Sequence, residues 1–177
     1  QGTLVVQEDA EMERVVVSGV ACDRNEAKIT VLRVADRPGI AAKLFGRVAE
    51  ANIVVDMIVQ NISQDGTTDI SFTVPKSDFA RAMALVNGVA TEIGAQQVVG
   101  DDRIVKVSVV GVGMRTHSGV AAQMFEVLSR ENINIMMIST SEIKVSCVID
   151  AKYGELAVRI LHETFGLAER GVVEECA

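Results

Sequence analysis

The chain has 177 residues, of which 49% are hydrophobic and 3% aromatic, so aliphatic side chains must build its core. Its net charge of −7, without a basic block, argues against a nucleic-acid partner. No apolar run approaches the roughly 18 residues that span a bilayer, and no secretory signal pattern begins the sequence. We therefore expect no membrane partner and a cytoplasmic location.

The first half of the sequence predicts one complete structural unit. Alternating apolar and polar residues are typical of strands, and apolar residues at helical spacing are typical of helices. The predicted strands are Lys28–Val34, Ile53–Val59, Thr68–Val74 and "AQQVV", and the helices are Gly39–Ala51 and a segment capped by Ser77 and ended by Gly94. The order is βαββαβ, which is the ferredoxin-like arrangement.

The second half contains a similar unit that lacks one strand. Its predicted strands are Ile104–Val112, Ile133–Ser139 and Ile143–Ile149, and its helices lie near Gly119–Arg130 and Lys152–Thr164. Near the N-terminus, "RVVVSGVA" (Arg14–Ala21) predicts a strand without a unit of its own. Because an open sheet edge is a pairing hazard, we expect this strand to fill the vacant edge beside Ile104–Val112.

An internal repeat supports two related domains. "GIAAKLFGRVAEANIVVDMI" (Gly39–Ile58) aligns without gaps with "GVAAQMFEVLSRENINIMMI" (Gly119–Ile138). We predict an α+β fold of two interleaved ferredoxin-like domains, the N-terminal strand completing the second. The predicted divisions are a leader at 1–13, that strand at 14–22, a first domain at 23–101, a second at 102–166 and a tail at 167–177.

Cysteine and histidine do not indicate a metal centre. Cys22, Cys147 and Cys176 are far apart, which favours reduced thiols over a disulfide framework or a zinc site. Cys147 falls in an apolar strand pattern and is predicted to be a core residue. His117 and His162 are isolated from each other, so we predict neither a metal nor a cofactor.

The loop "ADRPGIAAKLF" (Ala35–Phe45) has two interpretations. Asp36 can begin a turn that Pro38 and Gly39 shape. Alternatively, the open amides where a helix begins can receive a carboxylate, and Asp36 can receive an ammonium or hydroxyl group. From the loop alone, both interpretations remain open.

Several motifs resemble the paired ACT domains of bacterial aspartate kinase. They are "LRVADRPGIAAKLF", "VDMIVQNIS", "GTTDISFTV", "VGVGM" followed by "HSGVAAQMFEVL", and "NINIMMISTSEIKVSCVI". The resemblance covers about Gly2 to His162 and implies a regulatory β-subunit or a C-terminal regulatory region. The family's catalytic kinase domain has no counterpart here, and no GxxxxGK[ST] motif occurs. We therefore expect no catalytic residues and no enzyme activity from this chain by itself.

The resemblance implies an effector site shared between two chains. Its first-domain contacts, carried over by position, are Asp36, Pro38, Gly39, Ile40, Ala41 and Gln60. Its contacts from a partner copy are Asn134 and Ile135.

A possible second effector site follows from the equivalent loop of the second unit. Its residues are Met114, His117, Ser118, Val120, Ala121 and Ser141, with Glu142 and Asp56 as possible anions. The family commonly has Pro where Ser118 stands. Ser63 and Ser141 match family positions where substitution relieves feedback inhibition.

The resemblance implies an allosteric regulator that binds threonine, lysine or both and feedback-inhibits aspartate phosphorylation. The implied partners are a catalytic kinase subunit or domain and a second copy in a homodimer. One alternative is a free-standing ACT regulator that acts through protein contacts alone. Another is an acylphosphatase-like hydrolase, for which Arg37 offers a phosphate-cradling candidate without a convincing Asn partner.

Overall fold

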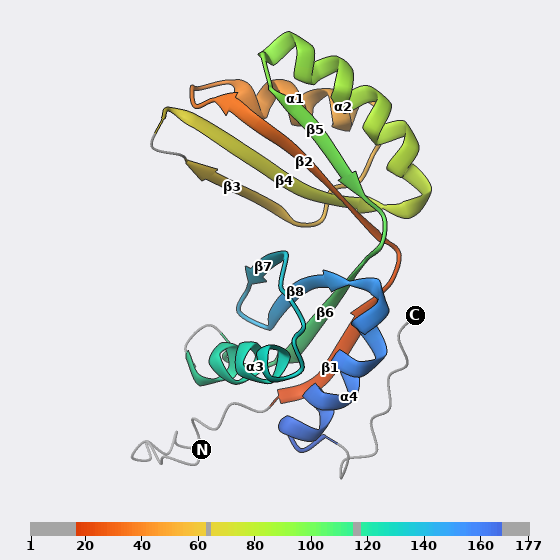
Figure 1. The fold of residues 1–177 in the computed structure, drawn as a ribbon, viewed down its shortest axis with the longest axis vertical. Helices are drawn as coiled ribbons and strands as arrows, with labels where there is room; N and C mark the ends of the chain where they lie inside the picture. The colour runs from red at the N-terminus through yellow and green to blue at the C-terminus, as the bar shows by residue number, and fades with distance from the viewer. Residues whose placement is uncertain (1–16, 63–64, 115–117, 168–177) are drawn as a thin grey trace, which may run out of the picture.

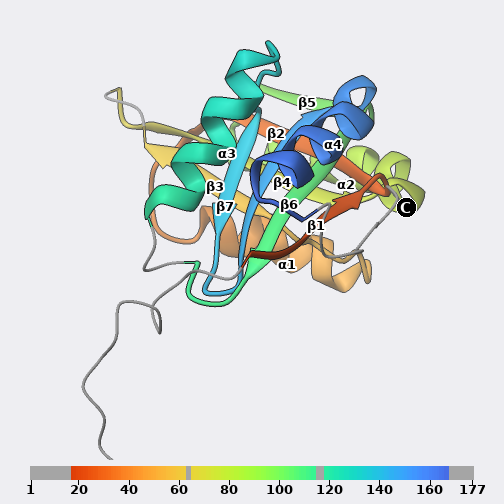
Figure 2. The ribbon, with the colours of Figure 1, turned by 90° about the horizontal axis from the view of Figure 1, so that it is seen from below.

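The computed structural model describes residues 17–62, 65–114 and 118–167. They form two domains, each a four-stranded antiparallel sheet with two helices on one face (Figure 1). In both domains the helices lie on the outer side, and the uncovered sheet faces are turned toward each other (Figures 1 and 2). This confirms the α+β prediction with two ferredoxin-like units.

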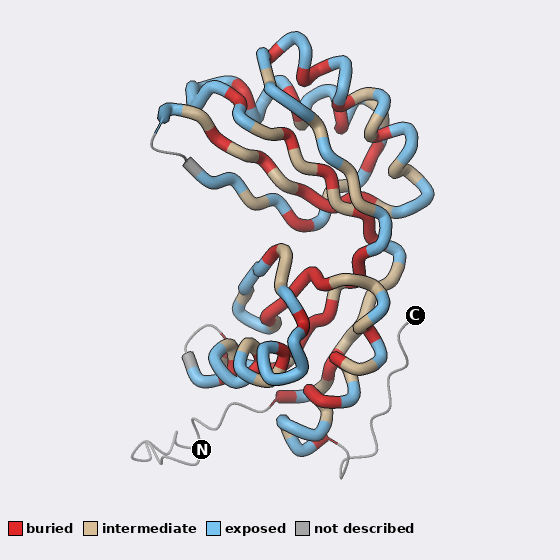
Figure 3. Tube along the Cα trace, in the orientation of Figure 1, coloured by how far each residue is buried: buried red, intermediate tan, exposed pale blue. Residues whose placement is uncertain are grey.

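The first domain has the sheet order β3-β4-β2-β5. Its elements are β2 (Glu26–Ala35), α1 (Ile40–Glu50), β3 (Ile58–Ile62), β4 (Thr67–Pro75), the 3₁₀ turn η1 (Lys76–Asp78), α2 (Phe79–Ile93) and β5 (Gln97–Asp101). Alternate residues of the central strands, such as Ile29 and Phe72, pack against apolar residues of the helices, such as Leu44 and Val86. Figure 3 shows the buried positions that recur along the two central strands, β2 and β4.

The second domain has the sheet order β1-β6-β8-β7. Its elements are β1 (Val17–Asp23), β6 (Ile104–Gly111), α3 (Ser118–Arg130), β7 (Met137–Thr140), β8 (Lys144–Asp150), the 3₁₀ turn η2 (Ala151–Tyr153) and α4 (Gly154–Thr164). β1 pairs antiparallel with β6, from Val17 opposite Gly111 to Asp23 opposite Lys106. The prediction that an N-terminal strand completes this domain is therefore confirmed.

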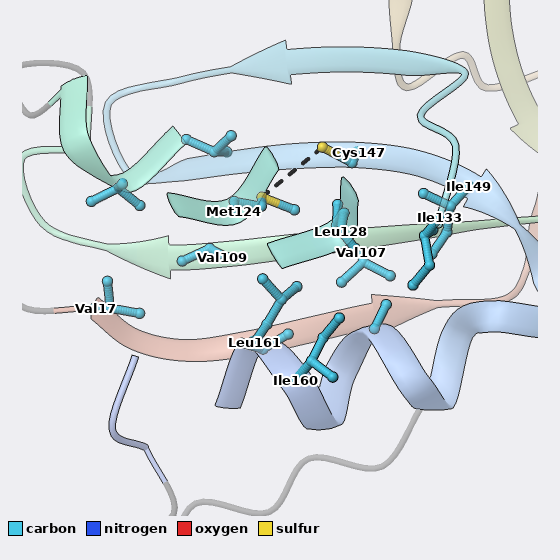
Figure 4. Packing of buried hydrophobic residues seen from close by; sticks show 14 of the residues in the cluster. Val17, Val107, Val109, Met124, Leu128, Ile133, Cys147, Ile149, Ile160 and Leu161 are labelled. Atoms are coloured by element: carbon cyan, nitrogen blue, oxygen red, sulfur yellow. Dashed lines mark hydrogen bonds between the residues drawn. The ribbon is translucent and has the colours of Figure 1, made fainter. Parts of the chain in front are cut away.

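The core of the second domain is aliphatic and sulfur-rich, as the composition requires. Leu128 and Leu161 pack from the two helices against Val107 of the sheet (Figure 4). Cys147 is fully buried and lies 4.0 Å, sulfur to sulfur, from Met124 (Figure 4). Its predicted core role is confirmed, and burial raises the pKa of its thiol from 9.0 to about 12.

The chain crosses between the domains twice, once from β1 to β2 and once from β5 to β6 (Figure 1). β2 pairs with β5 up to Lys28 opposite Asp101, and β1 pairs with β6 from Asp23 opposite Lys106. The two crossing segments thus run antiparallel to each other, and their backbone pairing is interrupted between the domains.

Two predicted strands begin later than expected. The segment from Ile53 runs as an irregular extended stretch, and β3 begins only at Ile58. Asn52, with φ 53°, turns the chain after α1, and Asp56 N–H donates to Thr73 O at 3.2 Å. In the second domain β7 begins at Met137 rather than Ile133, after the equivalent turn at Asn132.

Two further expectations are wrong. Ser77 lies within η1, and α2 begins after Asp78 without a side-chain cap, because the 3₁₀ turn already directs the chain into the helix. Cys22 is disulfide-bonded, which contradicts the expectation of reduced thiols. Gly94 does end α2 in the left-handed conformation, with φ 72°.

A small apolar cluster joins the domains. Met57 of the first domain packs with Ile104, Met137 and Val148 of the second. Within the described ranges, no helix combines the length and apolar character needed to cross a membrane.

Candidate functional site

A hollow of about 370 Å³ lies where β2 turns into α1. Its lining residues are Ala35, Asp36, Arg37, Pro38, Gly39, Ile40, Ala41, Gln60 and Thr68. The structure therefore brings together all six first-domain residues that the family resemblance implied. Gln60 joins them from β3 across the sheet edge, 19 residues after Ala41 in sequence.

The beginning of α1 offers unpaired backbone donors to this hollow. Gly39 occupies the N-cap position with φ 93°, and no side chain caps the helix. Its carbonyl accepts the first helical bond, from Lys43 N–H at 2.9 Å. The N–H groups of the first turn and the helix dipole together favour a negatively charged group at this end.

Asp36 supplies a negative group beside those donors. Its own N–H donates to Gly66 O at 2.9 Å, which fixes the backbone of the loop. Its side chain is exposed and makes no ion pair with any described residue. One edge of the hollow thus suits a carboxylate, and the neighbouring loop suits an ammonium or hydroxyl group.

Three residues that line the hollow, Ala35, Arg37 and Thr68, are not among the site residues that the resemblance implies. The sequence alone suggests Arg37 only as a phosphate-binding candidate and Thr68 only as a strand residue. Thr68 is almost fully buried, and its hydroxyl donates to Asn61 O at 2.7 Å, which ties β4 to β3 beside the hollow. The β-branched alternation around Thr68 gave no signal of this contact.

Asn134 and Ile135 lie elsewhere. They line a separate hollow of about 430 Å³ on the second domain, together with Phe125, Ser129, Asn132 and Ile133. A single chain does not bring this hollow to the α1 hollow. Their assignment to a site completed by a second copy stays a prediction.

Part of the second predicted site is assembled within the chain. Met114 N–H donates to Glu142 O at 3.1 Å, so the loop after β6 lies beside the turn between β7 and β8. Met114 and Val120 are buried, Ala121 is half-buried and Glu142 is exposed. His117, the side chain of Ser118, and Ser63 lie outside the described residues.

Asp56 and Ser141 have structural partners. Asp56 forms an ion pair with Lys106 between the domains, and the hydrogen bond from that ammonium group holds the pKa of the Asp56 carboxyl below its usual range. Ser141 Oγ accepts from Lys144 N–H at 3.1 Å, which closes the turn before β8. Asp56 is therefore not a free anion in this structure.

Comparison with known proteins identifies the family. An ACT domain model matches residues 32–88 and 107–165. The aspartate kinase Ask_LysC of Stutzerimonas stutzeri is 55% identical over 167 residues, and the aspartokinase of Pseudomonas aeruginosa is 54% identical over 168. These alignments cover 94% of this chain but only 40% and 41% of the relatives.

Solved structures of similar length narrow the identification. A chain in the crystal structure of aspartokinase alpha and beta subunits matches at 54% identity and a TM-score of 0.80, covering 85% of this chain and 99% of that one. The ligand-free regulatory subunit of aspartate kinase from Thermus thermophilus matches at 40% identity and a TM-score of 0.80, covering 84% and 98%. The chain therefore belongs to the ACT domain family. Within it, the chain corresponds to the regulatory region of bacterial aspartate kinases.

Proposed function

We propose that the α1 hollow binds an end-product amino acid, threonine and/or lysine, and that this binding feedback-inhibits a catalytic aspartate kinase subunit or domain. The observation that carries the proposal is an uncapped helix beginning next to an unpaired carboxylate. An α-amino acid carries the two complementary charges, a carboxylate and an ammonium group.

Several polar groups of the hollow have distinct roles in effector binding. The first-turn N–H groups of α1 receive the effector carboxylate, and Asp36 receives the ammonium group. Gln60 adds an amide that can donate or accept at the β3 side. Thr68 holds β3 against β4, so it positions Gln60 without contacting the effector.

Inhibition requires only that the effector binds the inhibited state better than the active state. A coupling free energy of roughly 1–3 kcal/mol changes activity by about 5- to 150-fold. A second copy, contributing Asn134 and Ile135 to the α1 hollow, would supply that preference because the effector then bridges two chains. A homodimer that tightens with effector is therefore part of the proposal, and sedimentation with and without threonine tests it.

Lysine has a second candidate position beside the turn between β7 and β8. Glu142 is exposed there and can receive a terminal ammonium group, and buried Met114 donates its N–H to the Glu142 carbonyl. The proposed relief of feedback inhibition by substitution at Ser63 or Ser141 belongs to the same regulatory role. The location that fits this role is the cytoplasm, with the kinase.

The proposal is tested by calorimetric titration of the chain with threonine, followed by lysine in the presence of threonine. Saturable binding with one threonine per α1 hollow is the expected result. No heat and no binding from either amino acid would contradict it. A kinase that this chain binds but that neither amino acid inhibits through it would favour the alternative, a free-standing regulator.

A further inference from the structure

The two domains meet at one largely buried ammonium group. Lys106 extends from β6 of the second domain, and its side chain is only 11% exposed. Its Nζ lies 2.5 Å from Glu26 Oε1 and 2.5 Å from Asp56 Oδ2, and both carboxylates belong to the first domain. A third carboxylate, Asp23 on the neighbouring strand β1, lies 3.3 Å away.

These four charged residues form a cluster of ion pairs around a largely buried ammonium group, unlike a salt bridge at the surface. Burial by itself would lower the pKa of Lys106, but the hydrogen bonds to Asp56 and Glu26 outweigh it and raise the pKa. Glu26 is 7% exposed, so removing the ammonium group would leave a buried carboxylate without its cation. Losing one partner of such a buried pair is far more costly than losing a surface salt bridge.

The other features at the junction are an interrupted backbone ladder and a small apolar cluster. The backbone ladder is interrupted between the pair Lys28–Asp101 and the pair Asp23–Lys106, so the two crossings form a hinge. The apolar cluster at the junction has four buried residues, of which Met57 comes from the first domain, and half-buried Val59 of β3 packs against them. Lys28 Nζ of the first domain also lies 3.8 Å from Met136 Sδ of the second. We therefore infer that the charged cluster is a major determinant of the angle between the two domains.

The same cluster is connected to the α1 hollow through β3. Asp56 lies two residues before β3, and Gln60 lines the hollow from within that strand. Among the described strands, β3 lies at the edge of its sheet with β4 as its one neighbour. A displacement of β3 therefore disturbs only the β3–β4 ladder among the described strands. Gln60, at the middle of β3, lies at the hollow, while the segment just before the strand adjoins Lys106.

We propose that the ion pair between Lys106 and Asp56 acts as a clasp that holds the second domain to the segment before β3. An effector that contacts Gln60 in β3 then changes the angle between the two domains through Asp56. This inference deepens the proposed function and rests on it for the identity of the effector. The clasp itself, however, is present without any ligand and can be tested alone.

The test uses nuclear magnetic resonance on the intact chain, with Met methyl groups and backbone amides labelled. Residual dipolar couplings report the interdomain angle, the Gly39 amide reports binding at the hollow, and the Met136 and Met137 methyl groups report the second domain. Lys106→Met keeps the side-chain stem and removes the charge. Asp56→Asn, a change at a more exposed position, is the second variant, and Lys106→Arg is the conservative one.

The matched control is Arg130→Met, which removes the same charge from an exposed pair with Glu126 on α3. Without ligand, we expect the interdomain angle to change in Lys106→Met and Asp56→Asn and to stay parental in Lys106→Arg and Arg130→Met. With saturating threonine, Gly39 should shift in every variant, while the Met136 and Met137 signals respond only where the clasp is intact.

The outcomes separate the two proposals. Parental dipolar couplings in both Lys106→Met and Asp56→Asn would overturn the clasp, as would an unchanged Met137 response to threonine in those variants. A Gly39 amide that responds to neither threonine nor lysine in the parent chain would instead overturn the proposed function. In that case the ligand-free angles would still decide whether Lys106 sets the domain arrangement.

Discussion

At the residue scale, Asp36 decides whether the loop before α1 is a binding site or only a turn. Its backbone N–H is used by Gly66, but its carboxylate is exposed and unpaired among the described residues. A side chain that only began the turn would be expected to bond to its own loop. The free carboxylate is therefore the feature of the hollow that most directly favours a ligand.

Replacing Asp36 by Ala should weaken threonine binding about 10- to 150-fold, because a hydrogen bond involving a charged group contributes roughly 1.5–3 kcal/mol. The melting temperature should barely change, since the side chain makes no contact that the fold needs. Calorimetric titration measures the threonine affinity, and thermal melts measure the melting temperature. Glu163→Ala, an exposed acidic position on α4, is the charge-matched control and should bind like the parent. Equal threonine affinity in Asp36→Ala and in the parent chain would show that the Asp36 side chain has no role in binding and that the loop is only a turn.

Cys147 predicts how stability depends on alkaline pH. Its thiol has a pKa of about 12 in the folded chain and 9.0 as the reference value, so the unfolded chain releases this proton first. The stabilisation is complete below about pH 9 and is lost as pH rises toward 12, at up to about 1.4 kcal/mol per pH unit.

Urea unfolding between pH 8.5 and 10.5 measures this slope. Cys147→Ala should be less stable at pH 8.5, because the side chain fills the core beside Met124, but its stability should fall less steeply with pH. The raised pKa of Lys106 acts in the same direction only above about pH 10.5, where that residue begins to lose its proton in the unfolded chain. An identical slope in both proteins would contradict the assignment to Cys147.

At the element scale, β5 and α2 approach each other closely at Gly100. A Cβ built at this position would lie 2.7 Å from both Met83 Sδ and Phe79 Cζ on α2. Gly100→Ala should therefore destabilise the first domain by about 1–3 kcal/mol through overpacking.

Gly88 offers the matched control for that substitution. It lies on the exposed face of α2, and a Cβ there meets nothing within 4 Å. Gly88→Ala should stabilise the chain by about 0.5–1 kcal/mol, because Ala has the higher helix propensity. Chemical denaturation of both variants checks the pair, and a Gly100→Ala variant as stable as the parent would show that β5 can move away from α2.

The elements were predictable where local pattern decides them. The helix spacing located α1 and α3, and the repeat located the order of strands in both domains. The starts of β3 and β7 were not predictable, because left-handed turns at Asn52 and Asn132 displace the chain before it joins the sheet. The role of Asp56 was also hidden, since its partner Lys106 lies 50 residues away and no local signal relates the two.

In the α1 hollow too, the residues that are contiguous in sequence were predictable and those brought in by strand pairing were not. The loop from Asp36 to Ala41 is contiguous and carried a recognisable motif, so its grouping was foreseen. Gln60 was implied by resemblance alone, and Thr68 was missed because its contact with Asn61 depends on strand register. Register is set by long-range pairing, which a single sequence does not display.

At the scale of the whole molecule, the second domain depends on a strand that comes before the first domain. Deleting residues 1–21 removes Val17 to Ala21 and leaves β6 unpaired on one side. Each buried backbone group left unpaired costs roughly 1–3 kcal/mol, against a total stability of about 5–15 kcal/mol.

We expect that truncation to abolish the cooperative melting of the second domain, and deletion of residues 1–13, which spares all of β1, to preserve it. Thermal melts followed by circular dichroism compare the two proteins. The near-ultraviolet signal of Tyr153, beside α4, reports on the second domain specifically. A 1–21 deletion that melts like the 1–13 deletion would show that β6 needs no partner on this side.

The interleaved strand order also has a consequence for how the chain folds during synthesis. β1 leaves the ribosome first, but its partner β6 begins 81 residues later, at Ile104. At roughly 5–20 residues per second, β1 waits about 4–16 s for that partner. The first sheet needs only residues 26–101 and can close in this interval, so it folds first and holds β1 close to where β6 will emerge. Nascent chains stalled with Asp101 outside the ribosome and Ile104 still inside it should therefore contain a protease-resistant first domain, with β1 still open to cleavage.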